Sequence, residues 1–167
     1  MMTFRLILCI LVVMLAIHTV FAGVDTRWHD KARDLYREGL AFNMCGRQEA
    51  ARECFTAAIR ADSNFTAAYS ALGNLCFEME SYEEALHYCL KAQQLGAGKM
   101  NRLIGLSWYQ LQQYEKALEA LQLAGKEEPA NSMIPHHLVQ IHAHLGHTSY
   151  NTGNFSAAII HWVNLLH

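Results

Sequence analysis

Polar and apolar positions alternate along most of the chain with the 3.6-residue period of amphipathic helices. The same short frame, a polar stretch that leads into an apolar stripe, occurs four times around the alanines Ala51, Ala85, Ala117 and Ala158. These alanines are 34, 32 and 41 residues apart. A period near 34 residues that is filled by two amphipathic helices is typical of an α-solenoid, in which stacked repeats bury one another's apolar faces. The pattern therefore predicts an all-α fold of about four helix pairs.

The predicted repeats cover residues 32–65, 66–97, 98–131 and 132–167, after a lead-in at residues 23–31. The fourth repeat comes about seven residues late, which is close to two helical turns. We therefore expect its first helix, which starts near Ser132, to be extended, and the repeat to be incomplete. Pro135 suits the first turn of this helix, where a missing N–H costs little.

One glycine stands in the middle of each predicted first helix: Gly39, Gly73, Gly105 and Gly146. A glycine at such a position costs about 1 kcal/mol relative to alanine. The cost is understandable if the two helices of a pair approach too closely for a Cβ atom. We expect the alanines of the second helices to share this contact, with large residues such as Phe55 and Trp162 filling the space beside it.

The residues of the second repeat, Tyr69, Leu72-Gly73, Tyr82, Ala85 and Ala92, resemble the tetratricopeptide repeat (TPR) family. The resemblance covers roughly residues 32–167 and implies a right-handed solenoid whose first helices line a concave, partner-binding groove. One subgroup of the family clamps a C-terminal carboxylate with Lys and Asn side chains. Here Tyr36, Leu40, Ser70 and Leu103 stand at the clamp positions, so we expect no such clamp. The more apolar groove favours hydrophobic stretches of polypeptide.

The core positions of the first helices also predict the side chains that line the groove. These are Tyr36, Leu40, Asn43, Ser70, Asn74, Phe77, Arg102, Leu106, Tyr109, His147 and Tyr150. Aromatic and amide side chains suit an extended peptide because they combine apolar area with hydrogen bonds to the backbone. We therefore expect a non-catalytic scaffold or adaptor, such as a co-chaperone or assembly factor, with a polypeptide partner and no cofactor.

Residues 1–22 follow a different pattern. Arg5 precedes an unbroken apolar run from Leu6 to Ile17, and Val20-Phe21-Ala22 gives a small–x–small ending before Gly23. This is the layout of a secretory signal peptide. The run is short for a membrane span, which needs about 20 residues. We expect export to the ER lumen and secretory pathway or to a bacterial periplasm. The alternative is a membrane-anchored assembly subunit, held by residues 6–22.

Composition and motifs narrow the function classes. A formal net charge of −2 with 17% charged residues gives no basic footprint for nucleic acid. Five histidines lie within twelve residues, but no carboxylate or nucleophile near them completes a site: His136, His137, His142, His144 and His147. We favour solvated or groove-facing histidines and no enzymatic activity. A metal-binding or catalytic protein that uses this segment is the alternative.

Two further motifs indicate possible covalent modification, a disulfide in one case and N-glycosylation in the other. Cys76 and Cys89 face each other across one predicted helix pair, and they are either joined by a disulfide or reduced core thiols. Asn64-Phe65-Thr66 and Asn154-Phe155-Ser156 match the N-glycosylation acceptor pattern in predicted turns, so in a eukaryotic host Asn64 and Asn154 are candidate glycosylation sites.

The last predicted helix, residues 155–167, is crowded with apolar side chains on more than one face. No following repeat covers its outer face. Apolar patches of this kind usually mark association sites. We therefore expect self-association through this helix, or its burial against a further C-terminal segment.

Overall fold

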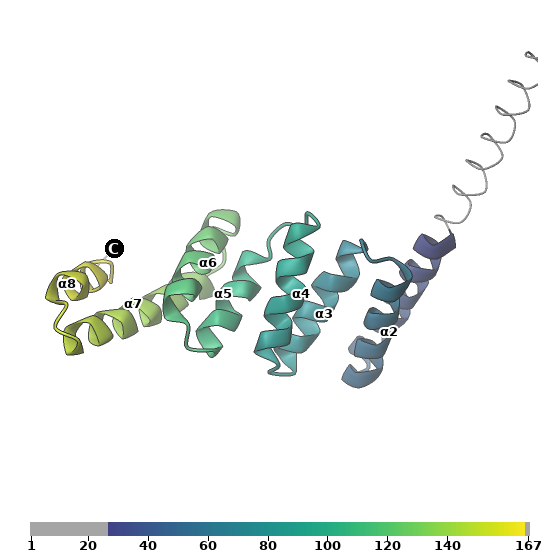
Figure 1. The fold of residues 1–167 in the computed structure, drawn as a ribbon, viewed down its shortest axis with the longest axis horizontal. Helices are drawn as coiled ribbons and strands as arrows, with labels where there is room; N and C mark the ends of the chain where they lie inside the picture. Colours follow the sequence, from purple (N-terminus) through teal and green to yellow (C-terminus); the bar gives the residue numbers. More distant parts are fainter. Residues whose placement is uncertain (1–26, 166–167) are drawn as a thin grey trace, which may run out of the picture. The chain divides into compact units, whose positions relative to one another are not determined.

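The computed structural model describes residues 27–165, which form helices and turns with no strand among them (Figure 1). They divide into two compact units, one that ends at Phe65 and one that begins at Thr66. The first unit contains a helix over residues 27–44 and helix α2. The labelled helices are α2 (Gln48–Ala61), α3 (Thr66–Glu78), α4 (Tyr82–Gln94), α5 (Asn101–Gln110), α6 (Tyr114–Glu127), α7 (Met133–Asn151) and α8 (Phe155–Val163).

The first unit is a single helical hairpin. The apolar stripe of α2 buries Ala51, Phe55 and Ala58. Tyr36, on the helix over residues 27–44, places its ring 5.7 Å from that of Phe55 and 5.4 Å from that of Phe65. The hairpin is therefore closed at its core by aromatic contacts.

In the second unit, three helix pairs follow one another in chain order. The strongest contacts are within the pairs α3–α4, α5–α6 and α7–α8, and contacts of α4 with α5 and of α6 with α7 join each pair to the next. The core is continuous across these junctions because the second helix of one pair and the first helix of the next bury apolar residues together. At the two junctions these residues are Leu86, Cys89, Leu103 and Ile104, and then Leu121, Ala124, Ile134 and Ile141.

The mid-helix glycines lie where the predicted close approach occurs. A Cβ atom built on Gly73 would lie 2.5 Å from Cys89 Sγ, and one on Gly105 would lie 2.6 Å from Leu121 Cγ. Gly39 and Gly146 meet Phe55 and the indole of Trp162 in the same way. The prediction of a contact too close for a Cβ is confirmed. The nearest atoms in every pair belong to the residue sixteen positions after the glycine, and the alanine takes part only at Gly73, where the Ala85 carbonyl oxygen lies 3.6 Å away.

The turn inside each helix pair has the same backbone conformation in all four pairs. A glycine indicates this conformation in two of the four turns. The residue seven positions after the glycine has a positive φ in all four pairs: 71° at Gly46, 60° at Glu80, 58° at Gln112 and 79° at Gly153. Glycine adopts this left-handed conformation readily, whereas other residues pay about 1–2 kcal/mol. Glu80 and Gln112 therefore hold their turns at a local cost.

Helix α7 is the extended helix expected near Ser132. It spans 19 residues, and Pro135 lies in its first turn. The outer side of α8 is apolar and exposed, with Phe155, Ile159 and Ile160 between 57% and 61% accessible. This exposure is the basis for the predicted self-association, which stays a prediction.

Within residues 27–165, no helix combines the length and apolar character that crossing a membrane requires. The predicted signal peptide or anchor, residues 1–22, lies outside the described residues.

Candidate functional site

Helices α5 and α7, the first helices of two successive pairs, form a hollow of about 570 Å³ between them. Tyr109 contributes from α5. The helical period places positions 140, 143, 144, 147, 148 and 151 on one face of α7. Those positions line the hollow with Gln140, Ala143, His144, His147, Thr148 and Asn151. Its volume is in the range of ligand sites, about 300–1,000 Å³.

A chain of hydrogen bonds fixes the polar wall of this hollow. The Tyr109 hydroxyl donates to Gln140 Oε1 at 3.0 Å. The Gln140 amide nitrogen in turn lies 3.2 Å from His136 Nε2. The Tyr109 ring also packs edge-on against Tyr114 and His137, with centroids 5.8 Å and 5.3 Å away. The hydroxyl and the amide are thus held at defined positions on the wall.

His144 forms the other anchored part of the wall. Its imidazole stacks on the Tyr114 ring, with centroids 4.4 Å apart and planes within 17°. His147, one turn further along α7, is exposed. Amide, imidazole and hydroxyl groups therefore stand at the groove-facing positions of α7, although apolar atoms contribute most of the surface that lines the hollow. The expectation of an apolar groove stays a prediction.

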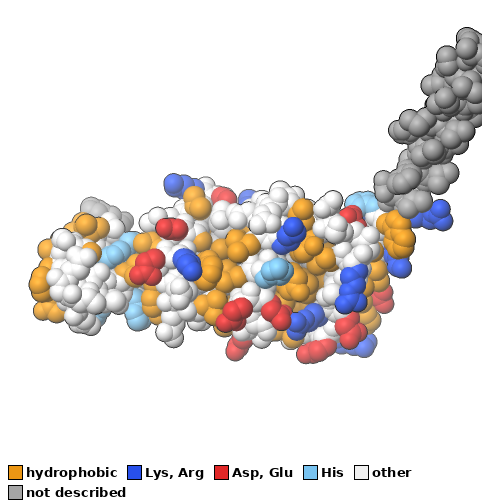
Figure 2. Space-filling view, in the orientation of Figure 1, with side chains coloured by type: hydrophobic (Ala, Val, Ile, Leu, Met, Phe, Trp, Pro, Cys, Tyr) orange, Lys and Arg blue, Asp and Glu red, His pale blue; other side chains and the backbone are white. Residues whose placement is uncertain are grey.

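The end of the sequence lacks acidic and strongly basic side chains and is rich in histidine. No Asp, Glu, Lys or Arg occurs from Pro129 to His167, yet seven of the ten histidines lie there. In Figure 2 the α7–α8 end shows histidine and apolar side chains on the visible face, while acidic and basic side chains appear over the other helices. The absence of charged side chains after Glu128 is the feature of the sequence that could have pointed to this hollow. The spacing of the histidines alone did not predict it.

One of the α7 histidines, His142, is neither solvated nor groove-facing, contrary to expectation, whereas His137 is half-buried and lines a small hollow with Arg102 and Leu106. His142 is buried on the face that packs against α8, where its Nδ1 lies 3.1 Å from His161 Nδ1. Burial, with a smaller contribution from His161, lowers the pKa of His142. Burial, and then His136, also lowers the pKa of His137, despite a hydrogen bond with Gln140 that raises it. His137 Nδ1 is buried without a hydrogen-bond partner.

The histidine segment does not assemble a metal site in the described part of the chain. Among residues 27–165, no three His, Cys, Asp or Glu side chains are placed to hold one ion. The period of α7 explains this result, because it directs His142 toward α8, His144 toward Tyr114 and His147 into the hollow.

A second, smaller hollow of about 120 Å³ lies beside the first. It brings together the predicted groove residues Arg102 and Leu106 with Met133 and His137. The Arg102 guanidinium lies 3.5 Å from the Glu128 carboxylate. The positive charge of Arg102 is therefore already balanced within the chain.

The remaining predicted groove residues of the second unit are largely engaged in local contacts. Asn74 is exposed, and its side-chain amide donates to the Ser70 carbonyl at 3.0 Å. Phe77 packs on Tyr82 and on the core between α4 and α5. The ring of Tyr150 lies 5.5 Å from that of Phe155 and 5.8 Å from that of Trp162. The Ser70 hydroxyl donates to the Thr66 carbonyl one turn earlier on α3.

Three predicted groove residues belong to the first unit. Tyr36 is half-buried in the hairpin, between Phe55 and Phe65, so its ring serves the packing of that unit. Leu40 is 38% exposed, and Asn43 is half-buried. Tyr109 and His147 share the larger hollow of the second unit, and Arg102 and Leu106 share the smaller one.

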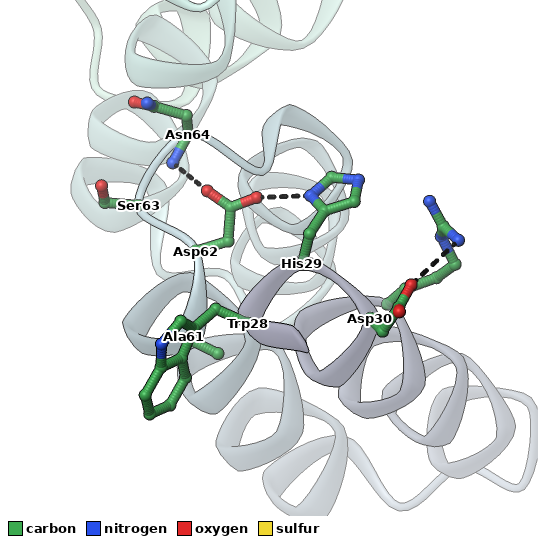
Figure 3. A pocket seen from close by; sticks show the side chains of 8 residues that line it. Trp28, His29, Asp30, Ala61, Asp62, Ser63 and Asn64 are labelled. Carbon is green, nitrogen blue, oxygen red and sulfur yellow. Dashed lines mark hydrogen bonds and ion pairs between the residues drawn. The ribbon is translucent and has the colours of Figure 1, made fainter. Parts of the chain in front are cut away.

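A further hollow, of about 840 Å³, lies in the first unit (Figure 3). His29 Nδ1 lies 2.7 Å from Asp62 Oδ2, and the Asn64 backbone N–H donates to Asp62 Oδ1 at 2.9 Å. The hydrogen bond with His29 is the main cause that lowers the pKa of Asp62. Ser63 points away from the imidazole in Figure 3, so a Ser–His–Asp arrangement is not formed. The contact holds the turn after α2 against the helix over residues 27–44.

Cys76 and Cys89 are reduced thiols in the protein core and are not joined by a disulfide. The Cys76 thiol donates to Glu84 Oε2 at 3.6 Å. Burial, with a contribution from Cys76, raises the pKa of Cys89 to about 12. Of the two alternatives in the sequence, the structure therefore has the core thiols.

The two glycosylation motifs lie in exposed turns. Asn64 and Asn154 are both exposed. The Asn154 side chain also caps α8, because its Oδ1 accepts the Ala157 N–H at 3.2 Å. Their glycosylation stays a prediction.

Comparisons with known proteins identify domains that have a similar fold. The family model described as a tetratricopeptide repeat matches residues 66–95. No curated protein sequence matches the chain. Solved structures do match. The first TPR of Spaghetti (RPAP3), bound to the HSP90 peptide SRMEEVD, is 22% identical over 68% of this chain and 91% of that chain, with a TM-score of 0.64.

Two other solved structures agree. The Arabidopsis OM64 TPR domain is 18% identical over 70% of this chain and 98% of that chain, with a TM-score of 0.65. MamA from Desulfovibrio magneticus RS-1 is 23% identical over 81% of this chain and 73% of that chain, with a TM-score of 0.55. The predicted fold class, an all-α solenoid of TPR-like helix pairs, is confirmed. The chain carries a tetratricopeptide repeat at residues 66–95 and has the fold of a tetratricopeptide-repeat protein.

Proposed function

We propose that this chain is a non-catalytic interaction scaffold that binds an extended polypeptide segment in the hollow between α5 and α7. The hollow carries the proposal because it is the larger of the two hollows described above in the second unit and lies between the first helices of two successive repeats. The TPR of Spaghetti, which has a similar fold, binds an HSP90 peptide, and the second TPR domain of human RPAP3 is in complex with an HSP70 peptide. These relatives support a peptide as the partner class.

The side chains of the hollow match the needs of a peptide backbone. An extended segment presents alternating N–H donors and C=O acceptors. The amide of Asn151 offers both functions, and the Thr148 hydroxyl, which donates to the His144 carbonyl at 2.9 Å, can still accept a hydrogen bond. Tyr109 adds rigid apolar area beside them. A co-chaperone or assembly factor is the form of this function that the TPR resemblance favours.

Filling the hollow tests the proposal. Peptides selected by phage display against the full chain, at pH 7.5 and at pH 5.5, are titrated by fluorescence anisotropy. Ala143→Trp places an indole in the hollow, and it should weaken binding about tenfold or more, which corresponds to about 1.4 kcal/mol. Gln122→Trp adds the same bulk at an exposed position of α6 outside the hollow and is the matched control. Equal affinities for Ala143→Trp and the wild type would show that the hollow is not the site.

The compartment is part of the proposal and rests on residues 1–22 alone. Their layout supports export, with the mature chain beginning at Gly23. Retention of the segment as a membrane anchor is the second candidate. Mass spectrometry of the N-terminus from the native host separates these outcomes, because recovery of Met1 in a membrane fraction supports the anchor and Met1 in cytosol contradicts export.

A further inference from the structure

The hollow between α5 and α7 has no fixed charge of its own. Its lining contains three groups that can titrate, Tyr109, His144 and His147, and no Asp, Glu, Lys or Arg. From α6, the group in contact with this lining is Tyr114, which stacks on His144. From α8, His161 faces His142 and not the hollow. The lining therefore carries no fixed charge, and the imidazoles are its basic groups.

Burial separates the histidines of α7 into two classes. His142 is buried and His137 is half-buried, and burial lowers the pKa of each, so both resist protonation. His136, His144 and His147 are exposed. Histidine is the side chain whose charge ordinarily changes between pH 5 and 8. The three exposed imidazoles are therefore the ones on α7 that are open to solvent protons. Two of these line the hollow, and the third bonds to Gln140 on its wall.

We propose that this hollow takes an acidic polypeptide segment as its ligand and binds it in the acid form, when His144 and His147 are protonated. This inference rests on the proposed function and adds the class of ligand and its control by pH. The hollow has no carboxylate among its lining side chains, so a carboxylate of the ligand meets no competing partner for the imidazolium groups there. The site is also concave, which admits a chain segment but not the flat surface of a bilayer.

The test uses fluorescein-labelled hexaglutamate as the probe, with hexaglutamine as the uncharged control peptide. Two partly exposed charge pairs are worth up to about 1 kcal/mol each, so hexaglutamate should bind the full chain about tenfold more tightly at pH 5.5 than at pH 7.5. Hexaglutamine should show no such change. His144→Gln with His147→Gln should remove the pH dependence, and His87→Gln, at an exposed position of α4, should keep it.

A fixed-charge variant separates ligand binding from any effect of acid on folding. His144→Lys with His147→Lys should bind hexaglutamate at pH 7.5 with an affinity close to that of the wild type at pH 5.5. Failure of this variant to bind, or pH-dependent binding that survives in the double glutamine variant, overturns the proposal. So does acid-dependent sedimentation with phosphatidylserine vesicles when hexaglutamate does not bind.

The two levels of the proposal fail differently. If selected peptides lack acidic residues and bind equally well at both pH values, but Ala143→Trp blocks them, the scaffold function stands and the pH-controlled site does not. If Ala143→Trp has no effect on any peptide, the hollow is not the binding site and both proposals fail.

Discussion

Replacing Gly73 by alanine should destabilise the chain, although alanine is the better helix former. The new Cβ would lie 2.5 Å from Cys89 Sγ and 3.3 Å from the Cys89 backbone nitrogen. The side chain can shift, but the backbone nitrogen moves only with α4. Overpacking of this kind costs about 1–3 kcal/mol, and the gain in helix propensity returns about 1 kcal/mol. We expect a net loss of about 1 kcal/mol in the free energy of unfolding.

Gly125 provides the matched control within the same fold. It also lies inside a helix, α6, but its Cβ would lie 3.6 Å from Ile134 Cγ2, an ordinary contact. Gly125→Ala should therefore stabilise the chain by about 0.5–1 kcal/mol. Urea titrations followed by circular dichroism at 222 nm give the unfolding midpoint of each variant. In Gly73→Ala/Cys89→Ala the loss should be smaller than the sum of the two single losses, because the sulfur has gone. A Gly73→Ala chain at least as stable as the wild type would refute the close-approach argument.

Four other predictions follow from single contacts. At pH 8 a thiol reagent should label the exposed Cys45 and leave Cys89 unreacted until unfolding, as read by peptide mass spectrometry, since burial raises the pKa of Cys89 to about 12. Glu80→Gly should stabilise the chain by about 1 kcal/mol in urea titration, because φ is 60° there. Burial lowers the pKa of His142. Below about pH 6.5 the unfolded chain therefore takes up a proton that the folded chain resists, and stability falls with decreasing pH. His142→Asn should flatten this loss in urea midpoints measured from pH 7.5 to pH 5. Ile159→Glu should reduce the mass found by light scattering at micromolar concentration, and a wild-type chain that is already monomeric would contradict self-association through α8.

The helix pairs could be predicted from the sequence because their packing repeats in strict register. Each mid-helix glycine meets the residue sixteen positions later, whatever its type: Phe55, Cys89, Leu121 or Trp162. The same contact between the two helices therefore recurs in all four pairs. The turns were less predictable, because Glu80 and Gln112 adopt the conformation of Gly46 and Gly153 without being glycine. There the packing of the two helices imposes the turn, and local preference does not.

The site could be predicted from the sequence only in part, because side chains on the groove-facing side of a helix can be buried by packing against neighbouring helices. The spacing placed Phe77 and Tyr109 on the same side of successive first helices. Each ring packs on the tyrosine five positions later and on the core of the next junction, but Tyr109 also lines the hollow. Nothing in the local pattern distinguishes these aromatics. What distinguishes them is the position of the next helix, and the extended α7 is the element that supplies most of the hollow's lining.

The positions along α7 also explain how one residue type can serve two independent pH responses. His142 and His147 are five residues apart, so they lie on different sides of the helix. His142 is buried against α8, where protonation opposes folding. His147 lines the hollow, where protonation favours an acidic ligand. A glutamine at 147 should therefore weaken acid-dependent binding without changing how stability varies with pH, while a polar neutral residue at 142 should do the reverse. If both substitutions shifted both profiles together, the pH dependence would belong to the folding of the α7–α8 pair, and the hollow would have no separate role.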